Sequence, residues 1–257
     1  MLLAIDIGNT HTVLGCFRGE QLLAQWRIAT DRQRTEDEYG VLMIELLRNS
    51  DLNPRDVRGV AIACVVPPTL EIFTAASRSY FSCEPFVVSA ENECGLRILY
   101  NPPHAVGADR IANAVAAMHK YGLPAVVVDL GTATTFDVIS RNAEYLGGAI
   151  TPGIHISLEA LSARAARLPR IALSKPPRAI GRTTEESMQS GVVFGTVGMV
   201  DWLVRQIKKE LNDEPIVIAT GGLAEAIAHE SDQIRIVDKQ LTLDGLRLLY
   251  SLNNSSE

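Results

Sequence analysis

Two stretches of the chain carry nearly the same order of apolar and polar positions. Residues 2–17 read LLAIDIGNTHTVLGCF, and residues 125–139 read AVVVDLGTATTFDVI. Each is an apolar run ending in Asp, then a turn with Gly and Thr, then a second β-rich run, which predicts two strands joined by a turn. A third strand-like run follows each copy, at Leu22–Ala29 and at Glu144–Thr151. A repeat at half the chain length indicates two domains of one fold.

Helical and strand-like segments alternate after each set of three strands. Residues 35–47 place their apolar side chains on one helical face, and Thr35 with Glu38 forms a capping-box pair at the start. Further helices are predicted at 68–81, 109–121, 154–166, 184–211, 223–229 and 242–252, and further strands at 57–66, 85–89, 215–219 and 234–237.

This order of elements predicts an α/β protein with helices packed on mixed sheets. The pattern of three strands followed by alternating helices and strands occurs twice. We therefore expect an N-terminal domain at residues 1–121 and a C-terminal domain at residues 122–257.

The composition narrows the class of protein. Hydrophobic residues make up 47% of the 257 and charged residues 21%, which is typical of a globular chain. The net charge of −6, without a Lys/Arg run, argues against nonspecific nucleic-acid binding. The longest apolar run, Val60–Val66, is too short to span a bilayer. No signal peptide follows Met1, so we expect a cytoplasmic protein.

The cysteines and histidines give no metal or disulfide pattern. Cys16, Cys64, Cys83 and Cys94 have neither CxxC spacing nor a neighbouring His cluster, so zinc and disulfide frameworks are not expected. Cys16 and Cys64 lie in apolar runs and are interpreted as small core residues.

The candidate chemistry lies in the two repeated turns. The sequence contains neither GxxxxGK[ST] nor GxGxxG, which excludes a P-loop and a dinucleotide fingerprint. Gly8 and Gly131 allow backbone N–H groups to approach an anion closely. Asp6 and Asp129 would act on a phosphate only through a cation or a water, because like charges repel. One polar turn is weak evidence, but two turns related by a repeat indicate a phosphate site.

A second group of polar residues begins at Val106–Arg110. Asp109 and Arg110 would lie at the positive end of a helix. An N-cap role explains Asp109 alone, whereas a general base beside an anion-binding Arg explains both residues. Glu186 lies three residues after Thr183, a second capping-box pattern. Gly221 and Gly222 would let the backbone pass close to a flat ligand such as adenine.

Six segments together resemble the type III pantothenate kinase family, within the superfamily of acetate and sugar kinases, Hsp70 and actin. They are DIGNT at 6–10, GADR at 107–110, DLGTATT at 129–135, GGAITPG at 147–153, GRTTEESMQSG at 181–191 and TGG at 220–222. The resemblance reaches the TLDGL segment near the C-terminus and so covers nearly the whole chain. Each motif alone is weak, but six in the same order are specific.

The resemblance implies duplicated ribonuclease H-like (actin-like ATPase) domains, each βββαβαβα with a mixed sheet, and ATP in the cleft between them. It implies ATP-dependent phosphorylation of pantothenate, the first step of coenzyme A biosynthesis, with Asp109 as the general base. The implied pantothenate contacts are Tyr100, Gly107, Ala108, Asp109, Arg110 and Thr184. The implied ATP contacts are Asp6, Ile7, Gly8, Asn9, Thr10, His11, Thr12, Val13 and Thr132. Asp6 would lie near Mg²⁺, and Asp129 would bind a monovalent cation, K⁺ or NH₄⁺.

The family resemblance also implies a homodimer whose substrate site includes the partner subunit. Gly191, Gly195 and Gly198 recur along one predicted helix, where each costs ~1 kcal/mol relative to Ala. Close packing at these glycines, in the core or at a subunit interface, would offset that cost. The basic residues of segment 164–182 are interpreted as a solvated loop.

Two other functions remain open at this point. One is a non-catalytic ATP-binding regulator on the same fold, and the other is a small-molecule kinase with another acceptor.

Overall fold

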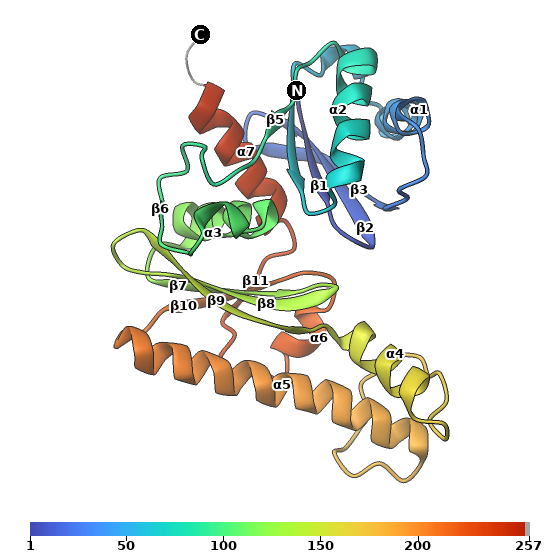
Figure 1. Cartoon of the computed structure of the whole chain (residues 1–257), viewed down its shortest axis with the longest axis vertical. Helices are drawn as coiled ribbons and strands as arrows, with labels where there is room; N and C mark the ends of the chain where they lie inside the picture. Colours follow the sequence, from blue (N-terminus) through green and yellow to red (C-terminus); the bar gives the residue numbers. More distant parts are fainter. Residues whose placement is uncertain (255–257) are drawn as a thin grey trace. The chain divides into compact units, whose positions relative to one another are not determined.

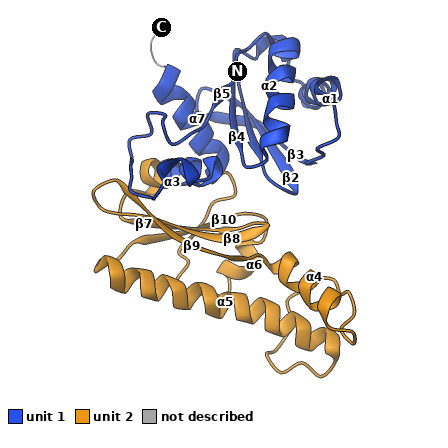
Figure 2. Cartoon of the chain, viewed as in Figure 1, with its two compact units in different colours: residues 1–116, 241–257 blue, residues 117–240 orange. Residues whose placement is uncertain are grey.

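The computed structural model describes residues 1–254, which form two compact units, each built on a mixed β-sheet (Figure 1). Unit 1 contains residues 1–116 together with the described residues from 241 onward, and unit 2 contains residues 117–240 (Figure 2). Residues 255–257, which the predicted C-terminal domain included, lie outside the described part of the chain.

The sheet of unit 1 has the order β3-β2-β1-β4-β5. Its strands are β1 (Leu2–Ile7), β2 (His11–Arg18), β3 (Gln21–Ala29), β4 (Gly59–Cys64) and β5 (Phe86–Val87). Strand β1 pairs antiparallel with β2 and parallel with β4, so its backbone is hydrogen-bonded on both sides. Its apolar side chains Leu3, Ile5 and Ile7 are fully buried in the core of this unit.

The strands of unit 2 follow the same order, β9-β8-β7-β10-β11. They are β7 (Ala125–Leu130), β8 (Ala133–Ile139), β9 (Glu144–Pro152), β10 (Ile216–Thr220) and β11 (Ile236–Val237). Asp6 of β1 lies opposite Val13 and Ala63, and Asp129 of β7 lies opposite Thr135 and Thr220 on the equivalent strands. The repeat expected from the sequence is therefore confirmed in topology. The register differs by one residue, because Asp6 pairs with the residue seven positions on and Asp129 with the residue six positions on.

Helices complete both units, and their positions agree with the predicted ones to within a few residues. The helices are α1 (Glu36–Arg48), α2 (Pro67–Phe81), α3 (Ala108–Tyr121), α4 (Ile154–Arg164), α5 (Thr184–Leu211), α6 (Ala224–Ala228) and α7 (Leu241–Asn254). Shorter elements, which the pattern did not predict, are β6 (Arg97–Ile98) and the 3-10 turns η1 (Pro54–Asp56) and η2 (Pro103–Ala105). None of the helices within residues 1–254 is long and apolar enough to cross a membrane.

The two predicted helix caps differ in detail. Thr35 and Glu38 form the full capping box at the start of α1. At α5, the Thr183 side chain accepts the Glu186 N–H at 3.1 Å as expected. The Glu186 carboxylate, however, accepts the Arg182 N–H at 2.7 Å, one residue before the position that a capping box requires.

The last helix lies elsewhere than the predicted domain division placed it. Helix α7 packs on β1 and β4, so it belongs to unit 1 although it follows all of unit 2 in sequence. The hydroxyl of Thr242 donates to Asn113 Oδ1 of α3 at 2.8 Å, and Gly245 lies against Ala112. The sequence shows that α7 is amphipathic, but not which sheet receives its apolar face.

We predict that Gly245→Ala destabilises unit 1 by about 1–3 kcal/mol, the usual cost of overpacking. A Cβ at this position would collide with the backbone carbonyl of Ala112, which cannot rotate away. Urea unfolding measures the change. Leu252→Ala, on the exposed side of the same helix, is the control and should shift stability by less than about 0.5 kcal/mol. Equal stability of the two variants would contradict this account of how α7 is held.

Candidate functional site

The first predicted phosphate turn follows β1 directly. The Gly8 N–H donates to the His11 carbonyl at 3.0 Å and closes the turn. A Cβ on Gly8 would lie 2.9 Å from that carbonyl oxygen, which explains the glycine. The predicted ATP contacts Asn9, Thr10 and His11 are exposed, and Asp6, Gly8 and Val13 are partly exposed. Ile7 and Thr12 are fully buried, so their side chains support the turn from inside.

The predicted base, Asp109, lies in the first turn of α3. The helix begins at Ala108, so Asp109 lies inside it rather than at the N-cap. Its Oδ1 accepts the Arg110 backbone N–H at 2.8 Å. A Cβ on Gly107 would lie 2.5 Å from this same oxygen, so the glycine keeps open the space that the carboxylate occupies. The GADR segment therefore holds one carboxylate in a defined orientation.

The surroundings of Asp109 act on its pKa in opposite directions. Burial of the carboxyl raises the pKa above its ordinary value, and this effect prevails over the lowering by the backbone N–H and the guanidinium of Arg110. Arg110 is itself 7% exposed, a buried cation beside a buried acid. A carboxylate with a raised pKa is a stronger base, which suits proton abstraction near neutral pH.

Cys64, at the end of β4, lies within the electrostatic influence of two predicted site residues, Asp6 and Asp109. Burial raises the pKa of its thiol, and the negative charges of Asp6 and Asp109 raise it further. Unit 1 thus brings Asp6 and Asp109 near a single thiol. Cys64 is partly exposed, unlike Cys16, and packs against the core of unit 1 at its edge. The parallel pairing of Cys64 with Ile7 carries it to the same sheet edge as Asp6, but the apolar run around it concealed this.

The second predicted turn, in unit 2, surrounds one carboxylate oxygen with glycines. Gly221 follows β10 with φ +92°, and a Cβ there would lie 2.6 Å from Asp129 Oδ1. A Cβ on Gly131 would lie 3.4 Å from the same oxygen. The two glycines therefore leave the space that the Asp129 carboxylate occupies. Thr132 is exposed at the turn, and its carbonyl accepts the Gly153 N–H at 3.2 Å.

The remaining predicted substrate contacts lie apart along the chain. Tyr100 is partly exposed in the loop between β6 and η2, in unit 1 with Gly107, Ala108 and Arg110. Thr184 is exposed at the first residue of α5 in unit 2. It lines a surface cavity of about 720 Å³ together with Leu161, Leu168, Gly181, Arg182, Thr183, Ser187, Met188, Gly191 and Val192.

The acidic residues fit cations that use ligands from the substrate as well. Within residues 1–254, no group of three or more His, Cys, Asp or Glu side chains is arranged to hold a metal ion. Asp6 and Asp129 therefore each offer a single carboxylate. Mg²⁺ suits such a site, because it keeps several waters and is commonly held by one or two carboxylates plus substrate phosphates.

Comparison with known proteins identifies the family. The family model for type III pantothenate kinase matches residues 2–206. The chain belongs to the type III pantothenate kinase family. A type III pantothenate kinase of Desulfatibacillum aliphaticivorans is 49% identical over 257 residues and covers all of both chains. That of Syntrophus aciditrophicus (strain SB) is 48% identical over 254 residues, covering 99% of this chain and all of the relative.

The family assignment also accounts for the fold. An inorganic polyphosphate/ATP-glucomannokinase from Arthrobacter sp. strain KM superposes with a TM-score of 0.52 at 16% identity, covering 98% of each chain. At that identity the likeness concerns the fold alone. Together with the two mixed sheets, in which five strands follow the same order, it shows the duplicated ribonuclease H-like architecture of this kinase family.

We predict that Asp109→Asn makes the protein more stable than the native chain at pH 7. Because the folded-state pKa lies above the ordinary 3.8, folding favours the protonated acid, and stability is lost as pH rises through the raised pKa. Asn remains neutral and avoids this loss, so the difference should shrink as the pH falls toward 4. Thermal unfolding at both pH values measures it.

Asp238 provides a control of opposite sign. Its pKa is lowered despite its burial, because Lys120 and Tyr121 donate hydrogen bonds to the carboxylate at 2.6 and 2.8 Å. Asp238→Asn should therefore reduce stability at pH 7, with a smaller loss at low pH. A stabilised Asp238→Asn or a destabilised Asp109→Asn at pH 7 would contradict the assigned charge environments.

Proposed function

We propose that this chain transfers the γ-phosphoryl group of ATP to the primary hydroxyl of pantothenate, with Asp109 as the general base. The observation that carries the proposal is the Asp109–Arg110 pair in the first turn of α3. The carboxylate is fixed by a backbone N–H at 2.8 Å and has a raised pKa, and a buried guanidinium lies next to it in sequence. In a chain of this family, that pair fits an acceptor with a hydroxyl and a carboxylate.

The acceptor would use both residues. The Asp109 carboxylate takes the proton of the hydroxyl as the oxygen attacks phosphorus, which typically contributes about 10²–10⁴-fold to the rate. Arg110 pairs with the pantothenate carboxylate, because guanidinium and carboxylate bind in a charge-assisted manner. Tyr100, Gly107 and Ala108 line the acceptor in unit 1, and Thr184 is a further contact in unit 2.

ATP would bind through the two turns. The exposed residues Asn9, Thr10 and His11, with the backbone around Gly8, contact its phosphates, and Thr132 makes a second contact. We propose that Asp6 holds Mg²⁺ and that Asp129, in its glycine cradle, holds K⁺ or NH₄⁺. These ions neutralise the phosphate charge, while the chain fixes the orientation of the reacting groups.

We also propose a homodimer that forms on helix α5. Gly191, Gly195 and Gly198 are exposed on α5, and a Cβ on any of them would meet no atom of the chain within 4 Å. Each of these glycines weakens the helix by ~1 kcal/mol, and close packing within the described chain does not offset that loss. Trp202 is 56% exposed one turn further along. A second copy packed on this surface would cover the tryptophan and use the small residues for close approach.

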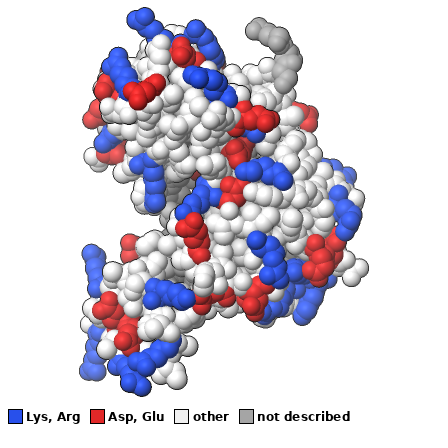
Figure 3. Space-filling view, turned by 180° about the vertical axis from the view of Figure 1, so that it is seen from behind, with Lys and Arg blue, Asp and Glu red and all other residues white. Residues whose placement is uncertain are grey.

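The chain is proposed to act in the cytoplasm, without nucleic acid or membrane partners. All four cysteines are free thiols, which suits a reducing compartment. Lys and Arg side chains lie among Asp and Glu side chains on the face drawn in Figure 3, and the net charge is −6. A protein that binds a nucleic-acid backbone typically carries a continuous patch of Lys and Arg side chains, and the described residues on this face form none.

Coupled ADP release with ATP, Mg²⁺ and pantothenate tests the proposed activity. We expect pantothenate-dependent turnover that potassium stimulates, and a loss of about 10²-fold or more in kcat for Asp109→Asn with ATP binding retained. ATP binding by calorimetry without turnover would favour the regulator instead. Turnover with another small alcohol, and none with pantothenate, would favour the kinase with another acceptor. Unchanged turnover of Asp109→Asn would refute the assignment of Asp109 as the general base.

The dimer is tested at Gly195, where the monomer has open space for a side chain. We expect the native chain to have a dimeric mass by light scattering and Gly195→Arg to be monomeric with unchanged circular dichroism. Glu210→Arg, an exposed position about two turns beyond Trp202 on the same helix, is the control and should remain dimeric. A monomeric native chain at assay concentration would refute the proposal.

A further inference from the structure

One threonine outside the recognised motifs contacts three positions of the first phosphate turn. Thr30, the residue after β3, donates its hydroxyl to the Gly8 carbonyl at 2.7 Å. Its backbone N–H donates to the Thr10 carbonyl at 3.0 Å, and its hydroxyl lies 2.9 Å from that of Thr12. Thr30 is thus bonded to the start, the middle and the end of the turn.

The direction of these bonds follows from proton counting. A threonine hydroxyl carries one proton, and Thr30 gives that proton to the Gly8 carbonyl. The Thr12 hydroxyl is therefore the donor to Thr30. Thr12 is fully buried, so its hydroxyl depends on this bond. The result is a relay from Thr12 through Thr30 to the Gly8 carbonyl.

Fixing the Gly8 carbonyl also fixes a donor on the other side of the turn. The peptide unit between Gly8 and Asn9 is planar and trans, so its C=O and N–H point in opposite directions. With the carbonyl held by Thr30, the Asn9 N–H is directed away from Thr30. Asn9 is exposed. A backbone N–H held in this way costs little further ordering when it binds a phosphate oxygen.

The repeat shows that the hydroxyl is an addition to the turn and is not needed to form it. The residue after β9, Gly153, donates its N–H to the Thr132 carbonyl at 3.2 Å, just as Thr30 donates to Thr10. A Cβ on Gly153 would collide with that carbonyl, so the second turn has no side chain here. In the second turn, this strand-end residue contributes a backbone bond and no side chain. In the first turn, the Thr30 side chain makes two further bonds.

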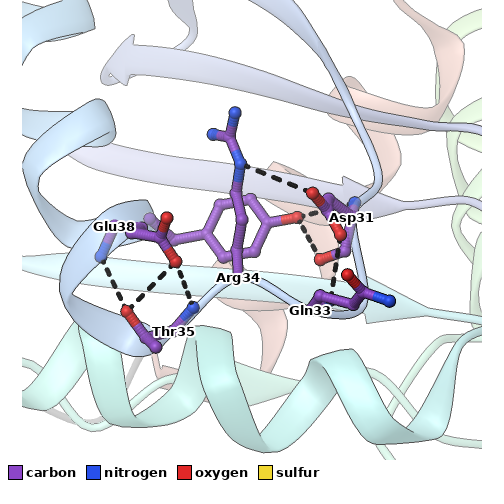
Figure 4. Close-up of polar contacts among 6 residues, drawn as sticks. Asp31, Gln33, Arg34, Thr35 and Glu38 are labelled. Carbon is purple, nitrogen blue, oxygen red and sulfur yellow. Dashed lines mark hydrogen bonds and ion pairs between the residues drawn. The ribbon is translucent and has the colours of Figure 1, made fainter.

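The backbone next to Thr30 is itself anchored by the side chain of Tyr39. The Asp31 N–H donates to the Tyr39 hydroxyl, and that hydroxyl donates to the Asp31 carbonyl, both at 2.9 Å (Figure 4). The Tyr39 ring is fully buried and lies 4.3 Å from the Phe73 ring. The Thr35–Glu38 capping box follows directly (Figure 4). The segment that carries Thr30 is therefore anchored to the core of unit 1.

We propose that Thr30 is a positioning residue for ATP, which orients the Gly8–Asn9 peptide of the phosphate turn without touching the nucleotide. The inference rests on the proposed binding of ATP phosphates at this turn. Thr30 acts through the Gly8 carbonyl and the Thr12 hydroxyl.

Thr30→Val tests the proposal, because valine keeps the shape and the backbone N–H but removes the hydroxyl. We expect the KM for ATP and the calorimetric Kd for ATP to rise about tenfold, since the Gly8 carbonyl and the buried Thr12 hydroxyl lose their partner. The KM for pantothenate should change by less than about twofold, because the hydrogen bonds of Thr30 go to the phosphate turn and not to the proposed acceptor residues. Thr30→Ser keeps the hydroxyl and should restore most of the ATP affinity.

A matched control separates positioning from general stability. Ser77 donates a buried hydroxyl bond to the Phe73 carbonyl at 2.7 Å, in the same unit and away from the turn. Ser77→Ala should lower the unfolding midpoint without changing the KM for ATP. Native ATP affinity in Thr30→Val, or equal changes in both KM values, would overturn the proposal. If the native chain binds ATP but does not phosphorylate pantothenate, the calorimetric comparison still decides the role of Thr30.

Discussion

The structure of both units depends on a central strand that is hydrogen-bonded on both sides and largely buried. The backbone groups of β1 pair with β2 and β4, and those of β7 pair with β8 and β10. A polar side chain within such a strand would lose its hydration without gaining partners. Polar chemistry is therefore confined to the strand ends, where Asp6 and Asp129 occur one residue before the last. The glycines that follow leave room around those carboxylates and for the turns that complete the site.

The turns themselves require rigidity, which their own residues do not provide. Exposed turn residues with few contacts would sample many conformations and would lose entropy on binding an anion. In unit 1 the neighbouring strand end supplies the missing contacts through Thr30, and the buried Tyr39 holds that strand end in place. In α3, Gly107 and the Arg110 N–H do the same for the Asp109 carboxylate. In each case the reacting or binding group is fixed by an adjacent element.

Most of the fold could be predicted because it depends on periodicity. The internal repeat, the succession of strands along the chain and the longer helices all left a pattern of apolar positions. The site was predicted only as far as its residues lie in recognisable motifs, and the roles of these residues stay predictions. The contact between Thr30 and Gly8 joins positions 22 apart, and a threonine after a strand resembles any turn residue. The apolar run around Cys64 gave no sign that this thiol lies at the same strand ends as Asp6. The sequence also did not indicate that α7 packs on the first sheet.

The two turns, although they descend from one pattern, are no longer equal. A hydrogen bond from the Gly8 N–H to the His11 carbonyl closes the first turn, and one from the Gly131 N–H to the Ala133 carbonyl closes the second. The side-chain bond from Thr30 to Gly8 in the first turn has no counterpart at Gly153 in the second. Duplication within one chain permits this divergence, because a change in one copy leaves the other intact. An assembly of two identical chains could not acquire it, since a mutation would alter both copies at once. The covalent link between the halves thus allows the two turns to differ in length and in hydrogen bonding.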